Sequence, residues 1–299
     1  MEKKILQIDE CYLHYVEAQR CDKPENIIIF LHGFPENWRT WRKQIDHFSA
    51  HCRVIAPDLP GYGESSKPAD LDFYQVPNLI SVMQRFVEFV ANGEKVILVA
   101  HDWGGAIAWP LVAFHSALFE KLIILNAAHP STFNREMVNN QQQRAKSAYI
   151  HDLIADTAES SITKDGFSLL INMFNDPQGQ CVLSPAELDE YLESWQRPDV
   201  LTGMLNYYRA MPQPVPKVYD DMPLPDLSNV KIPNIHIDVE TLILWGEQDL
   251  AFVPQLLDGI ESYVPNLTIM RFKLGTHWIH HQFSDAVNQK IDGFISTHL

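Results

Sequence analysis

A short apolar run that ends in a charged residue and two glycines is the feature that most constrains the fold of this chain. Residues 96–105 read VILVAHDWGG. A continuous apolar run of this length is typical of a strand that is buried on both faces of a parallel sheet. The small residues Ala100, Gly104 and Gly105 leave room for a sharp turn from strand to helix. Such a turn presents its central residue, here Asp102, at the carboxyl edge of the sheet.

Similar apolar runs recur along the chain and alternate with helical patterns. We expect strands at residues 4–8, 12–16, 27–31, 53–56, 96–100, 122–125, 242–245 and 267–272. Between them, residues 79–90 repeat apolar side chains every three or four positions, and residues 284–295 form a final amphipathic helix. This alternation predicts an α/β fold with a mostly parallel sheet and right-handed crossovers.

The alternation stops after Leu125 and resumes only at Leu242. The intervening residues are mostly helical in pattern and end in a stretch that is dense in proline, which favours extended, stiff connections. We therefore predict an α/β core made of residues 1–128 and 227–299. Residues 129–226 are predicted to form a helical cap over the carboxyl ends of the strands.

Composition and charge narrow the classes of function. The 299 residues suit one large α/β domain with an insertion. The formal net charge of −15 repels nucleic-acid phosphates and anionic lipids, so we expect neither partner. No apolar run is long enough to cross a membrane or to serve as a signal peptide. The four cysteines form no CxxC pair, which favours reduced thiols in the cytoplasm, and we expect no metal site and no cofactor. The sequence leaves open whether copies of the chain form a homo-oligomer.

Two further residues give Asp102 chemical partners. By itself Asp102 could be a helix N-cap, a salt-bridge partner or a metal ligand. After a turn of this kind, however, a catalytic chain order runs nucleophile, acid, histidine. Asp249 follows the strand in LILWGEQDLAF, and His277 follows the next strand in FKLGTHWIHH. All three fall at strand ends, where open α/β sheets keep their sites. Glu247 is the alternative acid, and His280 and His281 are alternative histidines.

A fourth element, LHGFPENW at residues 31–38, also follows directly after a strand. It resembles the loop that supplies one N–H of an oxyanion hole in this architecture, and Phe34 would provide that N–H. The residue after the nucleophile, Trp103, would provide the second. We expect the aromatic side chains of Phe34, Trp38, Trp103 and Trp278 to line an apolar substrate pocket.

Together these motifs resemble the α/β-hydrolase superfamily, in particular its aspartate-nucleophile branch of soluble epoxide hydrolases and haloalkane dehalogenases. The matching residues are His32 to Pro35, Asp58 to Ser65 (DLPGYGES), His101 to Gly105, Asp249 and His277-Trp278. They extend over nearly the whole chain. The resemblance implies the α/β-hydrolase fold with an inserted cap and no cofactor.

A carboxylate at the turn suits attack on saturated carbon. Aspartate has a reference pKa near ~3.9 and is already ionised at neutral pH, so Asp102 can attack without a base and form an alkyl ester. His277, oriented by Asp249, would then activate water to hydrolyse the ester. The N–H groups of Phe34 and Trp103 would stabilise the oxyanion formed in this second step.

The leaving group decides which reaction is performed. An opened epoxide needs a proton donor, whereas halide leaves as a stable anion. Epoxide hydrolases supply two cap tyrosines for this purpose. Residues 205–209, LNYYR, resemble the family segment Asn-Trp-Tyr-Arg and point to Tyr208; residues 143–149, QRAKSAY, resemble the segment that carries the other tyrosine and point to Tyr149.

Departures from the dehalogenase pattern point the same way. Phe34 stands where many haloalkane dehalogenases have an asparagine that donates to halide. Asn126 occupies a position where some dehalogenases place their acid. Trp103 replaces the arginine of fluoroacetate-type enzymes, but by itself it is ambiguous, because its indole N–H could also donate to a halide. We therefore predict an epoxide hydrolase that adds water to a small apolar epoxide and releases a vicinal diol. A haloalkane dehalogenase is the alternative enzyme, and a non-catalytic binding protein of the same fold is the alternative of another class.

Overall fold

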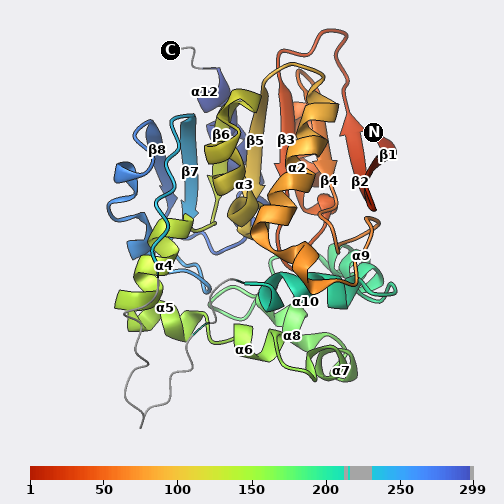
Figure 1. The fold of residues 1–299 in the computed structure, drawn as a ribbon, viewed down its shortest axis with the longest axis vertical. Coiled ribbons are helices and arrows are strands. Elements are labelled where there is room, and N and C mark those ends of the chain that lie inside the picture. The colour runs from red at the N-terminus through yellow and green to blue at the C-terminus, as the bar shows by residue number, and fades with distance from the viewer. Residues whose placement is uncertain (212–214, 216–230, 297–299) are drawn as a thin grey trace.

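The computed structural model describes residues 1–211, 215 and 231–296, and its centre is one eight-stranded sheet (Figure 1). The strand order is β1-β2-β4-β3-β5-β6-β7-β8. The strands are β1 (Glu2–Ile8), β2 (Cys11–Ala18), β3 (Ile27–Leu31), β4 (Arg53–Pro57), β5 (Val96–His101), β6 (Phe119–Leu125), β7 (Glu240–Gly246) and β8 (Leu267–Phe272). β2 runs antiparallel to β1 and β4, and all other neighbouring strands are parallel. The predicted α/β class with a mostly parallel sheet is confirmed.

The central strands are apolar on both faces because each face is covered by helices. In β3, Ile27, Ile29 and Leu31 belong to one core cluster, while Ile28 and Phe30 belong to the other. Successive side chains of a strand point to opposite faces, which explains this alternation. The first cluster lies under α2 (Val76–Ala91) and α3 (Asp102–Phe114), and the second lies under α1 (Arg42–Phe48) and α12 (Ser284–Ile295). A sheet buried on both faces leaves its edges and strand ends as the places where polar chemistry can gather.

Between β6 and β7 the chain forms a series of helices, as the loss of strand rhythm predicted. They are α4 (Pro130–Asn139), α5 (Gln141–Lys146), α6 (Ile150–Leu153), α7 (Ala158–Lys164), α8 (Ser168–Met173), α9 (Pro185–Trp195) and α10 (Val200–Arg209). Figure 1 shows them gathered beyond one end of the sheet, where the central parallel strands finish. The proline-dense stretch and the predicted boundary between residues 226 and 227 lie outside the described residues, so the division into core and cap domains stays a prediction.

Short helices complete the connections. They are the 3-10 helices η1 (Trp38–Trp41), η2 (Leu71–Tyr74), η3 (Ser116–Leu118), η4 (Pro254–Leu257) and η5 (Ile260–Ser262), together with α11 (Ile279–Gln282). The final helix has the predicted bounds, whereas α2 begins three residues before the expected position, with Pro77 in its first turn. Proline is favoured there because its missing N–H has no partner in the first turn of a helix.

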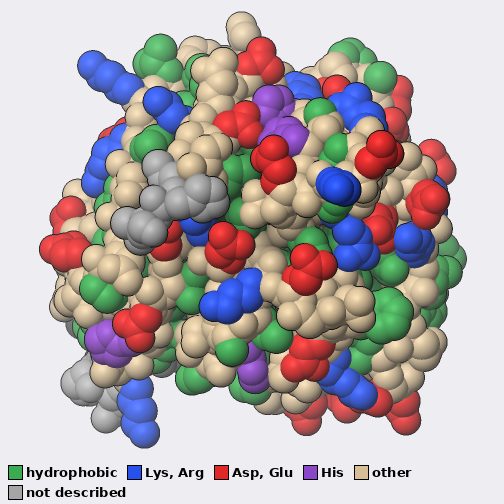
Figure 2. Space-filling model, turned by 90° about the horizontal axis from the view of Figure 1, so that it is seen from above, with side chains coloured by type: hydrophobic (Ala, Val, Ile, Leu, Met, Phe, Trp, Pro, Cys, Tyr) green, Lys and Arg blue, Asp and Glu red, His purple; other side chains and the backbone are tan. Residues whose placement is uncertain are grey.

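Figure 2 shows the end of the molecule opposite to helices α4–α10. Acidic and basic side chains are interspersed on this face, so neither sign of charge dominates it, and hydrophobic side chains form small separate areas. Within the described part of the chain, no helix combines the length and the apolar character that crossing a membrane requires.

The tight contact between α3 and the loop after β3 gives a stability prediction. A Cβ atom on Gly104 would lie 2.5 Å from the carbonyl oxygens of both Leu31 and His32. Because these are backbone atoms, Gly104→Ala is expected to lower the free energy of unfolding by about 1–3 kcal/mol. Gly293→Ala in α12 is the matched control. Its Cβ would meet no atom within 4 Å, so it should raise the free energy of unfolding by about 0.5–1 kcal/mol. Urea unfolding of the two variants measures both values, and equal values would contradict the close approach.

Candidate active site

The predicted turn at Asp102 is present and carries backbone strain. Asp102 follows β5 as the first residue of α3, and its φ angle is 49°. Residues other than glycine rarely adopt positive φ, and such strained positions are concentrated at functional sites. The loop after β3 passes so close that a Cβ atom on Gly33 would lie 2.3 Å from the Cβ atom of Asp102. The side chain of Asp102 is thereby held at the carboxyl edge of the sheet, where it lines a cavity.

The structure brings the three predicted residues together. The Nδ1 atom of His277 lies 2.7 Å from Oδ2 of Asp249, and Nε2 lies 3.6 Å from Oδ2 of Asp102. A carboxylate at Nδ1 fixes the tautomer and the orientation of the ring. The opposite nitrogen of His277 therefore faces the carboxylate of Asp102. The arrangement has the order and the geometry of a nucleophile, base and acid.

Asp249 is held by four hydrogen-bond donors. Its Oδ1 atom accepts the backbone N–H groups of Ala251 (2.7 Å) and Phe252 (3.0 Å), and its Oδ2 atom accepts Asn126 Nδ2 (2.7 Å) as well as His277. Sequence reasoning noted Asn126 only as a departure from some dehalogenases and gave it no role. Its place directly after β6, at the same sheet edge as Asp102, is the signal that could have identified it.

Helix α5 is also joined to the loop that carries Asp249. The Gln143 side chain donates its Nε2 to the carbonyl oxygen of Ala251 at 2.9 Å and accepts the N–H of Val253 at 3.0 Å. Gln143 is fully buried, and these two bonds satisfy both ends of its amide. The inserted helices and the loop with Asp249 are therefore connected directly.

Electrostatics favour a charged pair at Asp102 and His277. Burial raises the pKa of Asp102, but the close contact with His277 and its charge outweigh this effect and lower the pKa below its ordinary value. Burial lowers the pKa of His277, yet the charge of Asp249 and the contact with Asp102 raise it to about 10. At neutral pH, Asp102 is thus ionised and the imidazole is protonated.

One predicted oxyanion-hole donor already contacts the carboxylate. The backbone N–H of Phe34 donates to Oδ1 of Asp102 at 2.7 Å. Trp103 follows Asp102 in the first turn of α3, and its side chain lines the cavity. The assignment of the two N–H groups to an oxyanion hole remains a prediction.

A cavity of about 420 Å³ opens over Asp102. Tyr149 and Tyr208 line it together with Asp102 and Trp103. The ring centroids of the two tyrosines are 6.3 Å apart, and Tyr208 packs edge-on against Phe34 and Trp103. The rest of the lining is mainly apolar, and Asp102 is its only charged member among the described residues. Burial and then nearby groups, including the charge of Asp102, raise the pKa of both tyrosines, so both hydroxyls stay protonated.

Of the four aromatic residues predicted to line the substrate pocket, Trp103 is among the described residues that line the cavity, whereas Phe34, Trp38 and Trp278 are not. Trp38 belongs to the core cluster on the sheet face covered by α1 and α12. Trp278 packs against Phe174, and its Nε1 donates to the carbonyl oxygen of Met173 at 2.7 Å. The described residues that line the cavity include neither tryptophan. Apolar aromatic residues near a motif can serve the core instead, and a one-dimensional pattern does not separate the two uses.

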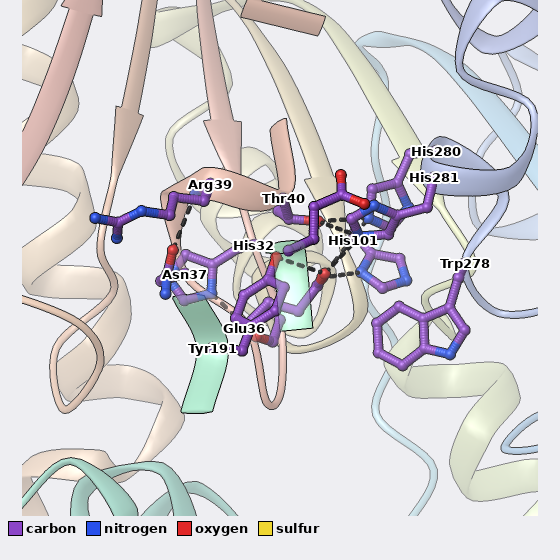
Figure 3. Close-up of polar contacts among 12 residues, drawn as sticks. His32, Glu36, Asn37, Arg39, Thr40, His101, Tyr191, Trp278, His280 and His281 are labelled. Atoms are coloured by element: carbon purple, nitrogen blue, oxygen red, sulfur yellow. Dashed lines mark hydrogen bonds and ion pairs between the residues drawn. The ribbon is translucent and has the colours of Figure 1, made fainter. Parts of the chain in front are cut away.

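The alternative acid and histidines make other contacts. Glu247 pairs with Arg271 at 2.8 Å on the surface. His280 and His281 face Glu36 and Thr40 rather than Asp102 (Figure 3). The geometry therefore selects Asp249 and His277 as the partners of Asp102.

Comparison with known proteins assigns the family. A family described as alpha/beta hydrolase fold matches residues 26–284. The chain belongs to the α/β-hydrolase family. This confirms the family and the fold that the motifs suggested.

Individual members give a finer picture of this α/β-hydrolase. The chain is 31% identical to Epoxide hydrolase 4 of Mus musculus, over 94% of this chain and 76% of that protein. It is 32% identical to the AB hydrolase superfamily protein YfhM of Bacillus subtilis (strain 168), over 93% and 92% of the two chains. A crystal structure of a Bacillus megaterium epoxide hydrolase in complex with an inhibitor superposes with a TM-score of 0.86 at 31% identity, covering 98% of this chain and all of that one. The predicted resemblance to epoxide hydrolases is confirmed.

The charged pair gives a prediction for the pKa of His277. Asp102→Asn removes one of the two negative charges beside the imidazole, so the pKa of His277 should fall from about 10 by about 1–3 pH units. Because the pKa of His277 is higher in the folded state than its ordinary value of 6.5, the protonated imidazole stabilises the folded protein. This stabilisation is fully present below pH 6.5 and is lost as the pH rises through about 10. Between pH 6.5 and about 10, the free energy of unfolding of the variant should therefore fall less steeply than that of the wild type.

An NMR titration of the His277 imidazole measures this pKa. Asp292→Asn is the control, because Asp292 contacts His47 and His51 on the surface instead. An unchanged pKa of His277 in Asp102→Asn would show that the two side chains are not coupled.

Proposed function

We propose that this α/β-hydrolase is an epoxide hydrolase that adds water to an apolar oxirane and releases a vicinal diol, with Asp102 as nucleophile. The observation that carries the proposal is the placement of Asp102, Tyr149 and Tyr208 on the lining of one apolar cavity. A nucleophilic carboxylate and two phenol donors are the groups that opening a three-membered ring requires. The similarity to epoxide hydrolases over more than nine-tenths of the chain supports the same activity.

In the first step the ionised carboxylate of Asp102 attacks a ring carbon. An alkyl ester forms, the carbon–oxygen bond of the ring breaks, and its electron pair goes to the departing oxygen. A tyrosine hydroxyl donates the proton that this oxygen takes up. Tyr149 and Tyr208 remain protonated because burial raises their pKa, and for Tyr149 the charge of Asp102 is the next largest cause. Esterification removes that charge, so the phenol becomes more acidic as the proton is needed.

In the second step water hydrolyses the ester. The same loss of charge on Asp102 removes one cause of the high pKa of His277, and the imidazole then releases its proton, which can restore the tyrosine. The neutral imidazole takes a proton from water, and the resulting hydroxide attacks the ester carbonyl. The N–H groups of Phe34 and Trp103 would stabilise the oxyanion of this intermediate, and Phe34 already donates to the carboxylate oxygen. The bond between the carbonyl carbon and the alkyl oxygen then breaks, and its electron pair goes to that oxygen. The oxygen takes up the proton of the added hydroxyl group, the diol leaves, and Asp102 is again an ionised carboxylate. Asp249 holds the protonated imidazole in place.

The cavity favours an uncharged substrate. Its lining has no charged group other than Asp102 among the described residues, and its volume is in the range typical of pockets for small organic ligands. Helices α4–α10 would act as a cap that covers this cavity and excludes water.

We also propose that the protein is located in the cytoplasm. The absence of disulfides among Cys11, Cys21, Cys52 and Cys181 supports this location.

A haloalkane dehalogenase with the same nucleophile is the second candidate. The Trp103 side chain favours it, because it lines the cavity and an indole N–H can donate to a departing halide. Two tyrosines over the nucleophile are not needed for that reaction, since halide leaves without a proton. We therefore place it behind epoxide hydrolysis.

Trapping the ester tests the nucleophile. In His277→Gln the first step should proceed while hydrolysis is slowed, so incubation with styrene oxide should add the mass of one substrate molecule to the peptide that contains Asp102. Peptide mass spectrometry after proteolysis checks this. The double variant Asp102→Asn/His277→Gln is the control and should gain no mass. Labelling of another residue in both variants would contradict the assignment.

The tyrosines distinguish the two reactions. Tyr149→Phe and Tyr208→Phe should each lower the rate of styrene oxide opening by about 10²-fold or more, because general-acid groups contribute about 10²–10⁴-fold. Stopped-flow single-turnover measurements give this rate. Alkylation by 1-bromobutane needs no proton and should be unaffected in both variants.

Tyr207→Phe is the matched control. Tyr207 is adjacent to Tyr208 but donates its hydroxyl to the carbonyl oxygen of Pro60 at 2.8 Å, so its loss should leave epoxide opening unchanged. If wild-type protein turns over 1-bromobutane far faster than styrene oxide, the dehalogenase function is correct instead.

A further inference from the structure

A second group of polar side chains is buried beside the catalytic histidine. Glu36 lies in the loop after β3, and His280 and His281 lie in α11. Their exposed fractions are 1%, 0% and 7%. Figure 3 shows the Glu36 side chain directed toward these imidazoles and toward His101. None of these four residues has a role in the mechanism described above.

The hydrogen bonds of this group leave part of its polar surface unsatisfied. Oε1 of Glu36 lies 2.7 Å from Nε2 of His281 and accepts the Tyr191 hydroxyl at 3.2 Å. Oε2 of Glu36 lies 3.6 Å from both Nε2 of His280 and Nδ1 of His101, which is too long for a hydrogen bond. Within the described part of the chain, neither Glu36 Oε2 nor His101 Nδ1 has a hydrogen-bond partner.

A carboxylate oxygen that is buried away from water without a hydrogen-bond partner lowers the stability of the folded protein. The Glu36 oxygen that lacks a hydrogen-bond partner lies 3.6 Å from Nε2 of His280. A bound cation would satisfy that oxygen, since buried charges are paired or coordinate metals.

We propose that Glu36, His280 and His281 bind one divalent transition-metal ion, for which Zn²⁺ is the best match. Two imidazoles and one carboxylate form a recognised zinc-binding set, and imidazole nitrogen suits zinc better than magnesium or calcium. The three ligand atoms all lie within 4.8 Å of one another. This proposal departs from the expectation of a metal-free protein. The sequence does not reveal the site, because Glu36 is far from the two histidines in sequence and no ligand spacing marks it.

The distances are close to those of a tetrahedral site. With bonds of about 2.0–2.1 Å, ligand atoms of a tetrahedral zinc site are about 3.3 Å apart. The separation of 3.6 Å between Glu36 Oε2 and His280 Nε2 needs only a small contraction. The separation of 2.7 Å between the other oxygen, Glu36 Oε1, and His281 Nε2 would have to widen by about 0.6 Å. The Thr40 hydroxyl, 2.7 Å and 3.0 Å from the two histidine Nε2 atoms, is placed to occupy or to orient a fourth position.

The metal site would connect the loop after β3 with helix α11, which follows His277. Glu36 follows Phe34, whose N–H donates to Asp102, by two residues. His280 follows His277 by three residues, and the carbonyl oxygen of His277 also contacts His101 Nε2 at 3.0 Å. A bound ion would therefore hold the loop after β3 against α11, without contact with the substrate.

Metal binding by the whole protein tests the proposal. After removal of metals with dipicolinate and alkylation of the thiols, wild-type protein should take up one equivalent of Zn²⁺ in a competition titration and should unfold at a higher temperature when it is added. Zinc K-edge absorption should show two imidazole ligands and no sulfur. Uptake of Co²⁺ should give the visible absorption of a tetrahedral site.

Variants locate the site. His280→Gln and His281→Gln should each weaken Zn²⁺ binding by about 100-fold or more, since loss of a ligand exceeds the 10–100-fold effect of losing an outer partner. The double variant His47→Gln/His51→Gln is the matched control, because these histidines face Asp292 on the surface, and it should bind as the wild type does.

The proposal is overturned if metal-free wild-type protein binds no zinc, or binds it with sulfur ligands. Equal binding by wild type and by His280→Gln would overturn it as well. The wild-type measurements decide the question even if a histidine variant fails to fold. None of them depends on epoxide turnover, so failure of the metal site and failure of the proposed activity can be distinguished.

Discussion

The left-handed backbone at Asp102 is the constraint on which the rest of the site depends. A residue with a φ angle of 49° directly after a buried strand cannot extend that strand, and its side chain is directed to the sheet edge. Gly33 and Gly104 allow the neighbouring backbone to approach, since a Cβ atom at either position would collide with it or with Asp102. The strain is balanced by the packing of the surrounding elements and by the N–H of Phe34.

Parallel strands place the partners of Asp102 without any contact in sequence. β5, β6 and β7 are neighbours in the sheet, so the residues that follow them meet at one edge. Asp102 and Asn126 follow the first two strands, and Asp249 lies in the loop after the third. His277 follows β8 and completes the set. A single hydrogen-bonded chain then runs from Asn126 through Asp249 to His277, and the imidazole faces Asp102.

The elements whose signals are local could be predicted from the sequence. The apolar runs gave the strands, and the turn residues identified Asp102, because both depend on neighbours in the chain. Trp38 shows the limit of such reasoning, since an aromatic residue after a motif is equally suited to the core behind the sheet. Asn126 and Glu36 show the same limit in the opposite case, because no sequence pattern assigned either residue a role. Their roles come from contacts with residues more than a hundred positions away, which no spacing encodes.

The two hydrogen bonds of Gln143 have a mechanical consequence for substrate exchange. They fasten α5 to the backbone on either side of Phe252, which lies three residues beyond Asp249. A hinge at this seam would displace Asp249 and uncouple the imidazole whenever the protein admitted a ligand. Entry of a ligand past the part of the lining that α2 and α3 supply, which includes Val76 and the largely exposed Phe114, would leave this connection intact. The contact between Asp249 and His277 would then stay intact while molecules enter and leave the cavity.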